Sequence, residues 1–127
     1  MRLYSEEWVA AFNEAVRGLE PTDPGVSFRM LQVVHGGPEG TVRVALCAQE
    51  GRVSLERDPG DDPAPQVTIS LQFDDALALA RGELDPAGLL AAGRVRVRGN
   101  LSILVRGQSL LAAAARRLEP LSERTNS

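Results

Sequence analysis

The chain contains one cysteine, one histidine and no lysine among its 127 residues. A lone Cys47 cannot form a disulfide within the chain, and a lone His35 leaves a monomer without the ligand sets of ordinary zinc sites. Because every basic residue is arginine, alongside many alanines and glycines, the composition indicates a GC-rich genome rather than selection for guanidinium groups. We therefore expect no disulfide, no metal ion and no cofactor.

Aromatic residues make up only 4% of the chain, and the net charge is -3. An acidic chain lacks the basic excess that phosphates demand, so we expect no nucleic acid partner. No apolar run reaches the length of about 20 residues that spans a bilayer. The N-terminal stretch carries Glu6 and Glu7 where a signal peptide needs apolar residues. These absences predict a cytoplasmic protein whose membrane contact is at most transient and peripheral.

The chain is long enough to bury one core, and 43% of its residues are hydrophobic. We expect a single domain over residues 1–127, in which the polar stretch 119–127 frays as a tail. With so few aromatic rings, the core must consist mainly of alanine, leucine and valine. Such side chains usually close-pack, but they can also line an internal void.

Hydrophobic periodicity predicts one helix and then a set of strands. Apolar residues recur at helical spacing from Ser5 to Leu19, which predicts an amphipathic helix that Ser5 caps. Period-two alternation then predicts four strands, and a fifth after a helical segment. The apolar positions of the five strands are Val26, Phe28, Met30 and Val34; Val42, Val44, Leu46 and Ala48; Val53 and Leu55; Val67, Ile69, Leu71 and Phe73; and Val95 and Val97.

The loops between the first three strands fix their register, because a hairpin loop of given length allows one pairing. The expected pairs are Leu46 with Leu55, Val34 with Val42, Met30 with Leu46, and His35 with Thr41. Apolar residues then share one face, and the other face collects Arg29, Arg43, Arg52, Glu56, Thr68, Ser70, Arg94, Arg96 and Arg98. This pattern predicts an α+β fold with a mostly antiparallel sheet that helices cover on one face only.

From Phe73 to Leu111, polar residues occur almost only at the ends of elements. An acidic cap opens a helix rich in leucine and alanine, and Asp85-Pro86 opens a short second helix that stops at Gly93. Alternating arginine and valine then predict a strand, which Gly99-Asn100 turns into a third apolar helical run. This segment contains no catalytic constellation, so it predicts an apolar binding surface.

The same segment resembles the sterol carrier protein type-2 domain, as a stand-alone domain of bacterial type. The resemblance lies in DALALARG from Asp75 to Gly82, then Leu84-Asp85-Pro86, then GRVRVRG from Gly93 to Gly99. That family shows three features in this order: a helix that ends in glycine, a short helix that an acidic residue and proline open, and a basic strand that glycine closes. The upstream helix and strands fit the family by order and length.

The resemblance implies a five-stranded, mostly antiparallel sheet covered on one face by about four to five helices that enclose an apolar tunnel. It also implies a non-enzymatic carrier of a fatty acid, fatty acyl-CoA or sterol-like ligand. Two departures predict a pocket of different shape: Asn100 follows the closing glycine where the family often has an acid, and Leu89 to Ala92 replace a bulky Phe or Met in the short helix.

The candidate ligand-binding residues combine the apolar faces with this resemblance. They are Phe28, Met30, Leu77, Leu84, Leu89, Leu90, Leu101, Leu104, Leu110 and Leu111. A packed core would need the same residues, since apolar helical faces usually just pack. A lined pocket and a filled core therefore both remain open, and no residue is assigned a catalytic or metal-binding role.

Three further features have a functional and a structural interpretation. The predicted C-terminal helix from Gln108 to Leu118 is either a packed terminal helix or a lid that moves to admit a ligand. The arginines at 94, 96 and 98 either bind the phosphates of an acyl-CoA or headgroup, or form a solvated face. Cys47 lies opposite Arg29, about 20 Å along the strand from His35, so these two cannot form a catalytic pair.

We therefore expect a lipid-binding or lipid-transfer protein that performs no chemistry, with a lipid or fatty acyl ligand as its partner. The alternative is an accessory protein-interaction or dimerisation module, in which the same apolar surface meets a partner enzyme or a second copy of the chain. An enzyme is the weakest hypothesis, because the chain lacks a plausible acid-base pair.

Overall fold

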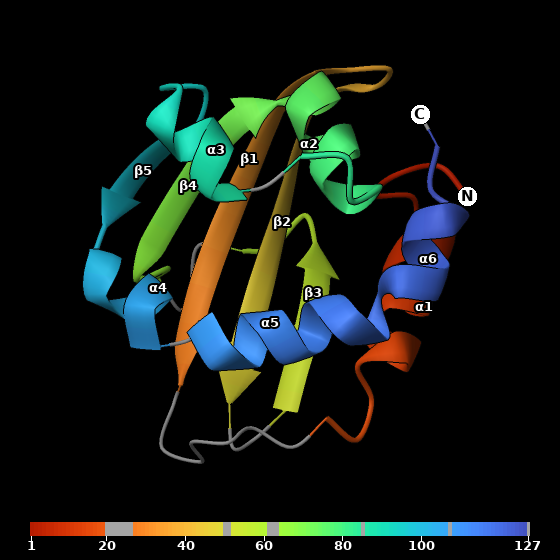
Figure 1. The fold of residues 1–127 in the computed structure, drawn as a ribbon, viewed down its shortest axis with the longest axis horizontal. Coiled ribbons are helices and arrows are strands. Elements are labelled where there is room, and N and C mark those ends of the chain that lie inside the picture. Colours follow the sequence, from red (N-terminus) through yellow and green to blue (C-terminus); the bar gives the residue numbers. More distant parts are fainter. Residues whose placement is uncertain (20–26, 50–51, 61–63, 85, 107, 127) are drawn as a thin grey trace.

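The computed structural model describes residues 1–19, 27–49, 52–60, 64–84, 86–106 and 108–126, without the side chains at 86–87, 104, 106 and 108–111. A five-stranded sheet in the order β3-β2-β1-β4-β5 carries helices over one face, so the predicted α+β class is confirmed (Figure 1). The elements are α1 (Glu6–Ala15), β1 (Phe28–Gly37), β2 (Gly40–Gln49), β3 (Arg52–Arg57), β4 (Val67–Gln72), α2 (Phe73–Ala80), α3 (Pro86–Ala91), β5 (Arg96–Gly99), α4 (Leu101–Arg106), α5 (Gln108–Arg117) and α6 (Glu119–Glu123).

The sheet is mostly antiparallel, with one parallel pair between β1 and β4. The predicted pairs Leu46 with Leu55, Met30 with Leu46 and Val34 with Val42 are confirmed. The predicted pair of His35 with Thr41 is wrong, because the register shifts between Val34 and Gly37. Gly36 takes a φ of 75° there, a left-handed conformation that suits glycine and accommodates the irregularity.

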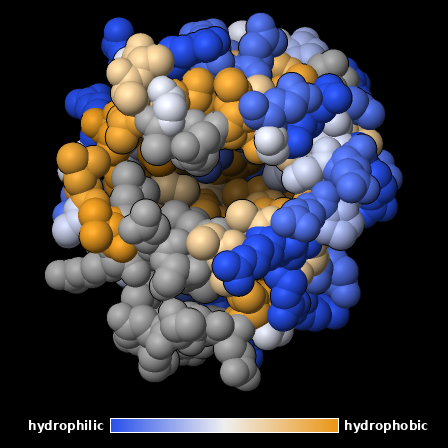
Figure 2. All heavy atoms as spheres, in the orientation of Figure 1, coloured by the Kyte–Doolittle hydropathy of each residue, from blue (hydrophilic) through white to orange (hydrophobic). Residues whose placement is uncertain are grey.

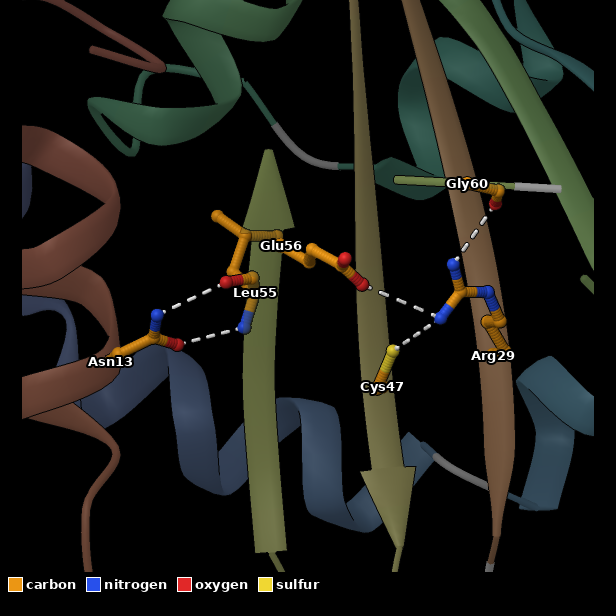
Figure 3. A network of polar contacts seen from close by, with 6 residues as sticks. All are labelled: Asn13, Arg29, Cys47, Leu55, Glu56 and Gly60. Atoms are coloured by element: carbon orange, nitrogen blue, oxygen red, sulfur yellow. Dashed lines mark hydrogen bonds and ion pairs between the residues drawn. The ribbon is translucent and has the colours of Figure 1, made fainter. Parts of the chain in front are cut away.

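Helix α1 packs on the β3 edge of the sheet and carries the aromatic part of the core. Ser5 caps α1 as predicted, since its hydroxyl accepts a hydrogen bond of 3.1 Å from the Trp8 backbone amide. Asn13 then binds the open edge of β3, donating to the Leu55 carbonyl at 3.0 Å and accepting from the Leu55 amide at 2.7 Å (Figure 3). These two bonds satisfy edge groups that would otherwise be free for pairing with another chain.

The face of the sheet opposite the helices is not uniformly wet, which corrects the prediction of a purely polar outer face. Ala45 is 0% exposed and Leu31 is 9% exposed on this side, and Pro59 is buried as well. Because β4 runs parallel to β1, the chain must cross the sheet after β3. Gly60 lies on that connection, and its carbonyl accepts a hydrogen bond of 3.3 Å from Arg29 on the outer face (Figure 3).

The C-terminal stretch is ordered by its contacts, so the expectation that residues 119–127 fray is wrong for the described part. Residues Glu119–Glu123 form α6, and Thr125 is only 4% exposed. The Trp8 indole donates a hydrogen bond of 2.9 Å to the Thr125 hydroxyl, and Arg2 pairs with Asn126 in an isolated bridge. The tail thus closes the end of the molecule where α1 begins.

The apolar run after Gly99 forms two helices, α4 and α5, rather than one. The predicted C-terminal helix is confirmed as α5, which crosses in front of β1, β2 and β3 (Figure 1). Among the described residues, α1 packs closely on β3 and α2 on β1 and β4, whereas α4 and α5 have their closest contacts with neighbouring helices. The cover of the sheet is therefore uneven.

Candidate lipid-binding site

One row of residues on the inner, helix-covered face of the sheet is only partly covered. Gln32, Ile69 and Val97 lie side by side on β1, β4 and β5, because Ile69 pairs with each of the other two. All three are half-buried, although β1 and β4 are interior strands of the sheet. Interior positions of a covered sheet face are normally buried, so their exposure indicates space above them.

The rows on either side are closed. Met30 pairs with Val67, and these residues are 4% and 1% exposed. Val34 pairs with Leu71, and these are 0% and 6% exposed. The half-open row also closes towards β2, where the partner of its first residue is Val44 with 0% exposed. On β1 and β4 this half-exposed row lies between buried rows, so we interpret it as the floor of a hollow.

Figure 2 shows a hollow on the helix-covered face, between α2 and α3 on one side and α5 on the other. The coloured side chains at its floor and along much of its rim are hydrophobic. The helices therefore do not fill the space over this part of the sheet. An apolar hollow binds an apolar molecule because binding removes hydrophobic surface from water.

Four of the predicted ligand-binding residues are shielded from solvent. Phe28 and Met30 lie on the inner face of β1 with 5% and 4% exposed. Leu77 on α2 is half-buried against the core, and Leu89 on α3 is 3% exposed. Among the described residues, Leu89 is not a member of the contiguous core cluster.

Three other predicted residues are exposed rather than buried. Leu84 is 40% exposed before α3, Leu90 is 54% exposed on α3, and Leu101 is 58% exposed on α4. With Val105 at 72%, they are the exposed large hydrophobic residues in the described part of the chain. The side chains of Leu104, Leu110 and Leu111 lie outside the described part, so their assignment to the site stays a prediction.

An ion pair between the exposed Arg94 and the buried Asp75, at the edge of this region, was not predicted. The Arg94 guanidinium lies 2.5 Å from a carboxylate oxygen of Asp75, which is only 4% exposed on α2. Arg94 precedes β5 and takes no part in that strand. The pair ties α2 to the approach to β5. The sequence offered no signal for this pair. Asp75 fits the simpler role of a helix cap, and Arg94 fits that of a solvated arginine.

The other predicted polar features lie on the outer face. Arg96 and Arg98 pair with Ser70 and Thr68 and are exposed there. Glu56 lies 3.6 Å from Arg29, another arginine of the outer face, and the same guanidinium contacts the Cys47 sulfur at 3.5 Å (Figure 3). The predicted position of Cys47 opposite Arg29 is confirmed. The arginines of β5 are therefore not part of the hollow.

Tyr4 is a residue of the site region that sequence reasoning passed over. It adopts a φ of 63°, rare for a side chain of this size, and only 7% of it is exposed. Burial raises the pKa of its hydroxyl group. That hydroxyl donates a hydrogen bond of 3.4 Å to the Gln32 side-chain oxygen. One signal was available, since Gln32 is a polar residue at an inner-face position between apolar neighbours on β1.

A second pocket, of about 230 Å³, opens beside the N-terminal segment. It contains none of the predicted ligand-binding residues, and its walls mix acidic, basic and apolar side chains. Its lining is Arg2, Leu3, Tyr4, Ser5, Glu6, Pro38, Glu39, Val42, Arg57 and Phe73. The mixed charge of this pocket does not favour an apolar ligand.

The fold and the hollow together define the class of protein. A sheet with an apolar, half-open inner face, partly covered by helices, provides a binding space for an apolar molecule. In the described part of the chain, no group of His, Cys, Asp and Glu side chains could hold a metal ion, and no helix is long and apolar enough to cross a membrane.

The chain belongs to the SCP-2 sterol transfer family, whose sequence profile matches residues 25–112. A comparison with curated proteins gave no match. Two solved structures share the fold over most of both chains. A candidate sterol carrier protein from Thermus thermophilus is 18% identical with a TM-score of 0.66, covering 96% of this chain and 88% of that one. Palmitated SCP2L2 from Aedes aegypti is 15% identical with a TM-score of 0.60, covering 87% and 91%.

A third solved structure places a similar domain inside a larger protein. The sec-alkylsulfatase Pisa1 from Pseudomonas sp. is 20% identical with a TM-score of 0.54. The match covers 75% of this chain but only 15% of the sulfatase chain. The same fold therefore occurs both as most of a chain and as a small part of one.

Proposed function

We propose that the protein binds one long-chain lipid in the hollow between the inner face of the sheet and the helices, and that it performs no chemistry on it. The ligand is a fatty acid, a fatty acyl-CoA or a sterol-like molecule. The observation that carries this proposal is the half-exposed row Gln32, Ile69 and Val97 between two buried rows, because it leaves apolar space where a filled core would leave none.

The residues proposed to contact the ligand fall into two groups. Phe28, Met30, Leu77 and Leu89 are shielded and form the wall, while Leu84, Leu90 and Leu101 are exposed and form the mouth. Leu104, Leu110 and Leu111 complete the proposed set. Membership of the SCP-2 sterol transfer family and the palmitated state of the Aedes aegypti protein of similar fold support a lipid with a long acyl or sterol-like body.

The hydrophobic effect is strong enough for such binding. Eight methylene groups moved out of water stabilise the complex by roughly 6 kcal/mol, at ~0.8 kcal/mol each. The loss of translational and rotational freedom on association reduces this figure. The net affinity is then weak to micromolar, which suits a carrier that must also release its ligand.

An accessory role is the second candidate function. In the Pseudomonas alkylsulfatase a similar domain makes up a small share of a larger chain. The exposed leucines around α3 and α4 would then meet a partner enzyme or a second copy of this chain, instead of lining the mouth of a pocket. The two roles use the same apolar surface, so they exclude each other at that surface.

Native mass spectrometry and ligand titration distinguish the two functions. The purified protein should carry co-purified lipid, and the delipidated protein should bind a fluorescent fatty acid saturably at one molecule per chain. The absence of both would overturn the carrier function. Concentration-dependent association of the delipidated chain, in place of lipid binding, would favour the accessory function.

A further inference from the structure

Gln32 occupies a position where an apolar residue would be expected. It lies in the middle of β1 on the inner face, between the buried residues Met30 and Val34. Its neighbours across the sheet are Val44 on β2 and Ile69 on β4. Burial of a polar side chain among apolar ones costs free energy unless its hydrogen bonds are satisfied. A glutamine at this point therefore calls for a partner.

The partner present satisfies only part of this side chain. The Tyr4 hydroxyl donates to the Gln32 oxygen at 3.4 Å, which is long for an O–H···O bond and therefore weak. In the described part of the chain, the Gln32 amide nitrogen has no hydrogen-bond partner. Gln32 is half-buried and belongs to the row that forms the floor of the hollow. Its free N–H groups thus lie at the polar end of an otherwise apolar space.

We propose that Gln32 and the Tyr4 hydroxyl recognise a neutral oxygen of the ligand, such as the hydroxyl of an alcohol or the carbonyl of an ester. Both groups are uncharged hydrogen-bond donors. A ligand oxygen would accept from the Gln32 amide and from the Tyr4 hydroxyl, whose weak bond to the Gln32 oxygen it would replace. This inference rests on the proposed function, and it adds the polar contacts that orient the lipid with its oxygen inward.

The charges nearby favour a neutral group over an ionised carboxylate. Burying a carboxylate without a cation is far more costly than burying a hydroxyl. The basic residue in the same row is Arg57, which pairs with Val44 from the far edge of the sheet. It stands two strands from Gln32, about 10 Å away, and its guanidinium lies 3.2 Å from Glu39. The charge of Arg57 is therefore already paired with Glu39, and it lies too far from Gln32 to pair with a ligand carboxylate there.

Competition binding tests this assignment. In this assay the delipidated protein is loaded with a fluorescent fatty acid, and dodecanol or dodecanoic acid is added as a competitor. The pH is about 8, where dodecanoic acid is ionised. Wild-type protein should prefer dodecanol. Gln32→Leu and Tyr4→Phe should each weaken dodecanol binding about three- to tenfold, the range of one hydrogen bond. Both variants should bind dodecanoic acid within about twofold of wild type, and the matched control Gln49→Leu, at an exposed position of β2, should change neither affinity.

Two results would overturn the proposal in distinguishable ways. Suppose that wild type binds the probe, but Gln32→Leu and Tyr4→Phe lower the affinities for dodecanol and dodecanoic acid equally, or change neither affinity. The pair then has no role in recognising the oxygen. If wild type binds no probe at all, the proposed carrier function fails and this inference fails with it. Thermal melts of both variants identify any loss that follows from unfolding, and Tyr4→Phe keeps the ring that packs on Trp8.

A different observation carries a second inference, about the surface around α3, β5 and α4. Every charged residue from Pro86 to Leu118 is an arginine, although the whole chain is acidic at -3. The exposed large hydrophobic residues of the described chain fall in almost the same stretch, from Leu84 to Val105. Figure 2 shows hydrophobic side chains along the side of the molecule where α4 lies. Both kinds of residue thus gather around the edge strand β5, where Arg96 and Arg98 lie on the outer face of the sheet and Leu90 and Val105 lie on helices α3 and α4.

The arginines of β5 are free to bind a partner. Arg96 and Arg98 are exposed and make no hydrogen bond or ion pair within the described part of the chain. Exposed leucine and valine beside unpaired arginines match the boundary between headgroups and acyl chains in an anionic bilayer. We infer that this side docks on an anionic membrane surface, with Leu90 and Val105 entering the interface and Arg96 and Arg98 binding phosphates.

Vesicle flotation tests the docking surface. Delipidated protein should bind vesicles of phosphatidylcholine with phosphatidylserine and bind pure phosphatidylcholine vesicles much more weakly. Arg96→Gln with Arg98→Gln should lower the partition coefficient about thirtyfold, at about fivefold for each arginine, and Val105→Ser should lower it further. The control pair Arg17→Gln with Arg52→Gln removes the same charge from exposed positions elsewhere and should have little effect.

Equal binding of all variants, or no binding to anionic vesicles, would overturn this inference. A third result would also overturn it: the protein binds no vesicles but self-associates in analytical ultracentrifugation, and the Arg96 and Arg98 substitutions abolish that self-association. The surface would then bind a second copy of the chain. Affinity for the fluorescent fatty acid in solution should not change with these arginines. The membrane surface and the ligand site therefore succeed or fail separately.

Discussion

The two halves of the sheet's inner face are covered in different ways. At the β3 side, α1 packs on β3 and α6 packs on α1, and the Trp8 ring lies between those of Tyr4 and Phe12 at centroid distances of 5.4 and 5.6 Å. Over β1, β4 and β5, the row of Gln32, Ile69 and Val97 is only half-buried, and the helices α3 and α4 leave leucines about half exposed. We call these the closed half and the open half.

The difference shows how a small domain combines stability with a binding space. Large rings and hydrogen bonds between distant parts of the chain stabilise the closed half, where the Trp8 indole binds Thr125. In the open half, the helices α3 and α4 are short and their exposed large residues are aliphatic, so it retains apolar surface for a ligand. Stability and binding should therefore respond to substitutions in different halves, except at Tyr4, whose hydroxyl reaches Gln32 in the open half.

The largest expected effect on stability comes from the closed half. Trp8→Ala removes a ring that is 6% exposed and leaves the Thr125 hydroxyl without its donor. We expect the free energy of unfolding to fall by about 3–5 kcal/mol, measured by urea denaturation. Ligand affinity of the fraction that remains folded should stay unchanged. A strong loss of affinity at full folding would contradict the division into halves.

Arg94→Gln tests the ion pair that ties α2 to the approach to β5. It leaves the buried Asp75 carboxylate without the guanidinium 2.5 Å away, which should cost about 1–3 kcal/mol of unfolding free energy. Arg52→Gln, at an exposed position, is the matched control. If both substitutions changed stability equally, the pair would not be structurally important.

The Tyr4 hydroxyl gives the closed half a dependence on alkaline pH. Burial raises its pKa, so the native state keeps a proton that the unfolded chain releases at about pH 10. Stability is therefore fully present below about pH 10 and falls above it, by about 1.4 kcal/mol for each further pH unit. The chain has no lysine and a single tyrosine, so Tyr4→Phe should remove this slope in urea titrations. A slope that persists in Tyr4→Phe would exclude Tyr4 as its source.

The smallest expected effect on stability comes from the open half. Leu90→Ser changes a side chain that is 54% exposed, so the unfolding free energy should shift by no more than about 0.5 kcal/mol. Its affinity for a fluorescent fatty acid should nevertheless fall, because the residue lies at the proposed mouth. A stability loss of several kcal/mol with unchanged affinity would show that α3 belongs to the packed core.

The fold was largely predictable from the sequence because its signals are local. Alternation and loop length fixed the pairs of Leu46 with Leu55 and Val34 with Val42, and the run from Asp75 to Gly99 indicated the family. Long-range contacts were not predictable. Nothing local shows that Thr125 binds Trp8, or that Gly60 on the connection after β3 binds Arg29 on the outer face.

The candidate site was predictable in its chemistry but not in its geometry. The list of apolar residues mixed shielded positions such as Met30 with exposed ones such as Leu101, because helical periodicity does not give the distance between a helix and the sheet. Gln32 was absent from it because strand patterns were read for their apolar members. Which row of the sheet stays exposed depends on the distance between the helices and the sheet. This distance is a property of the tertiary structure, which local sequence patterns do not give.

The most direct test of the division into halves is a two-dimensional amide NMR titration of the delipidated protein with a long-chain lipid. The largest shift changes should fall on β4, β5, α3 and the middle of β1 around Gln32, while α1 and α6 should change little. Shift changes centred on α1 and α6, or no changes at saturating lipid, would contradict a binding space over the open half.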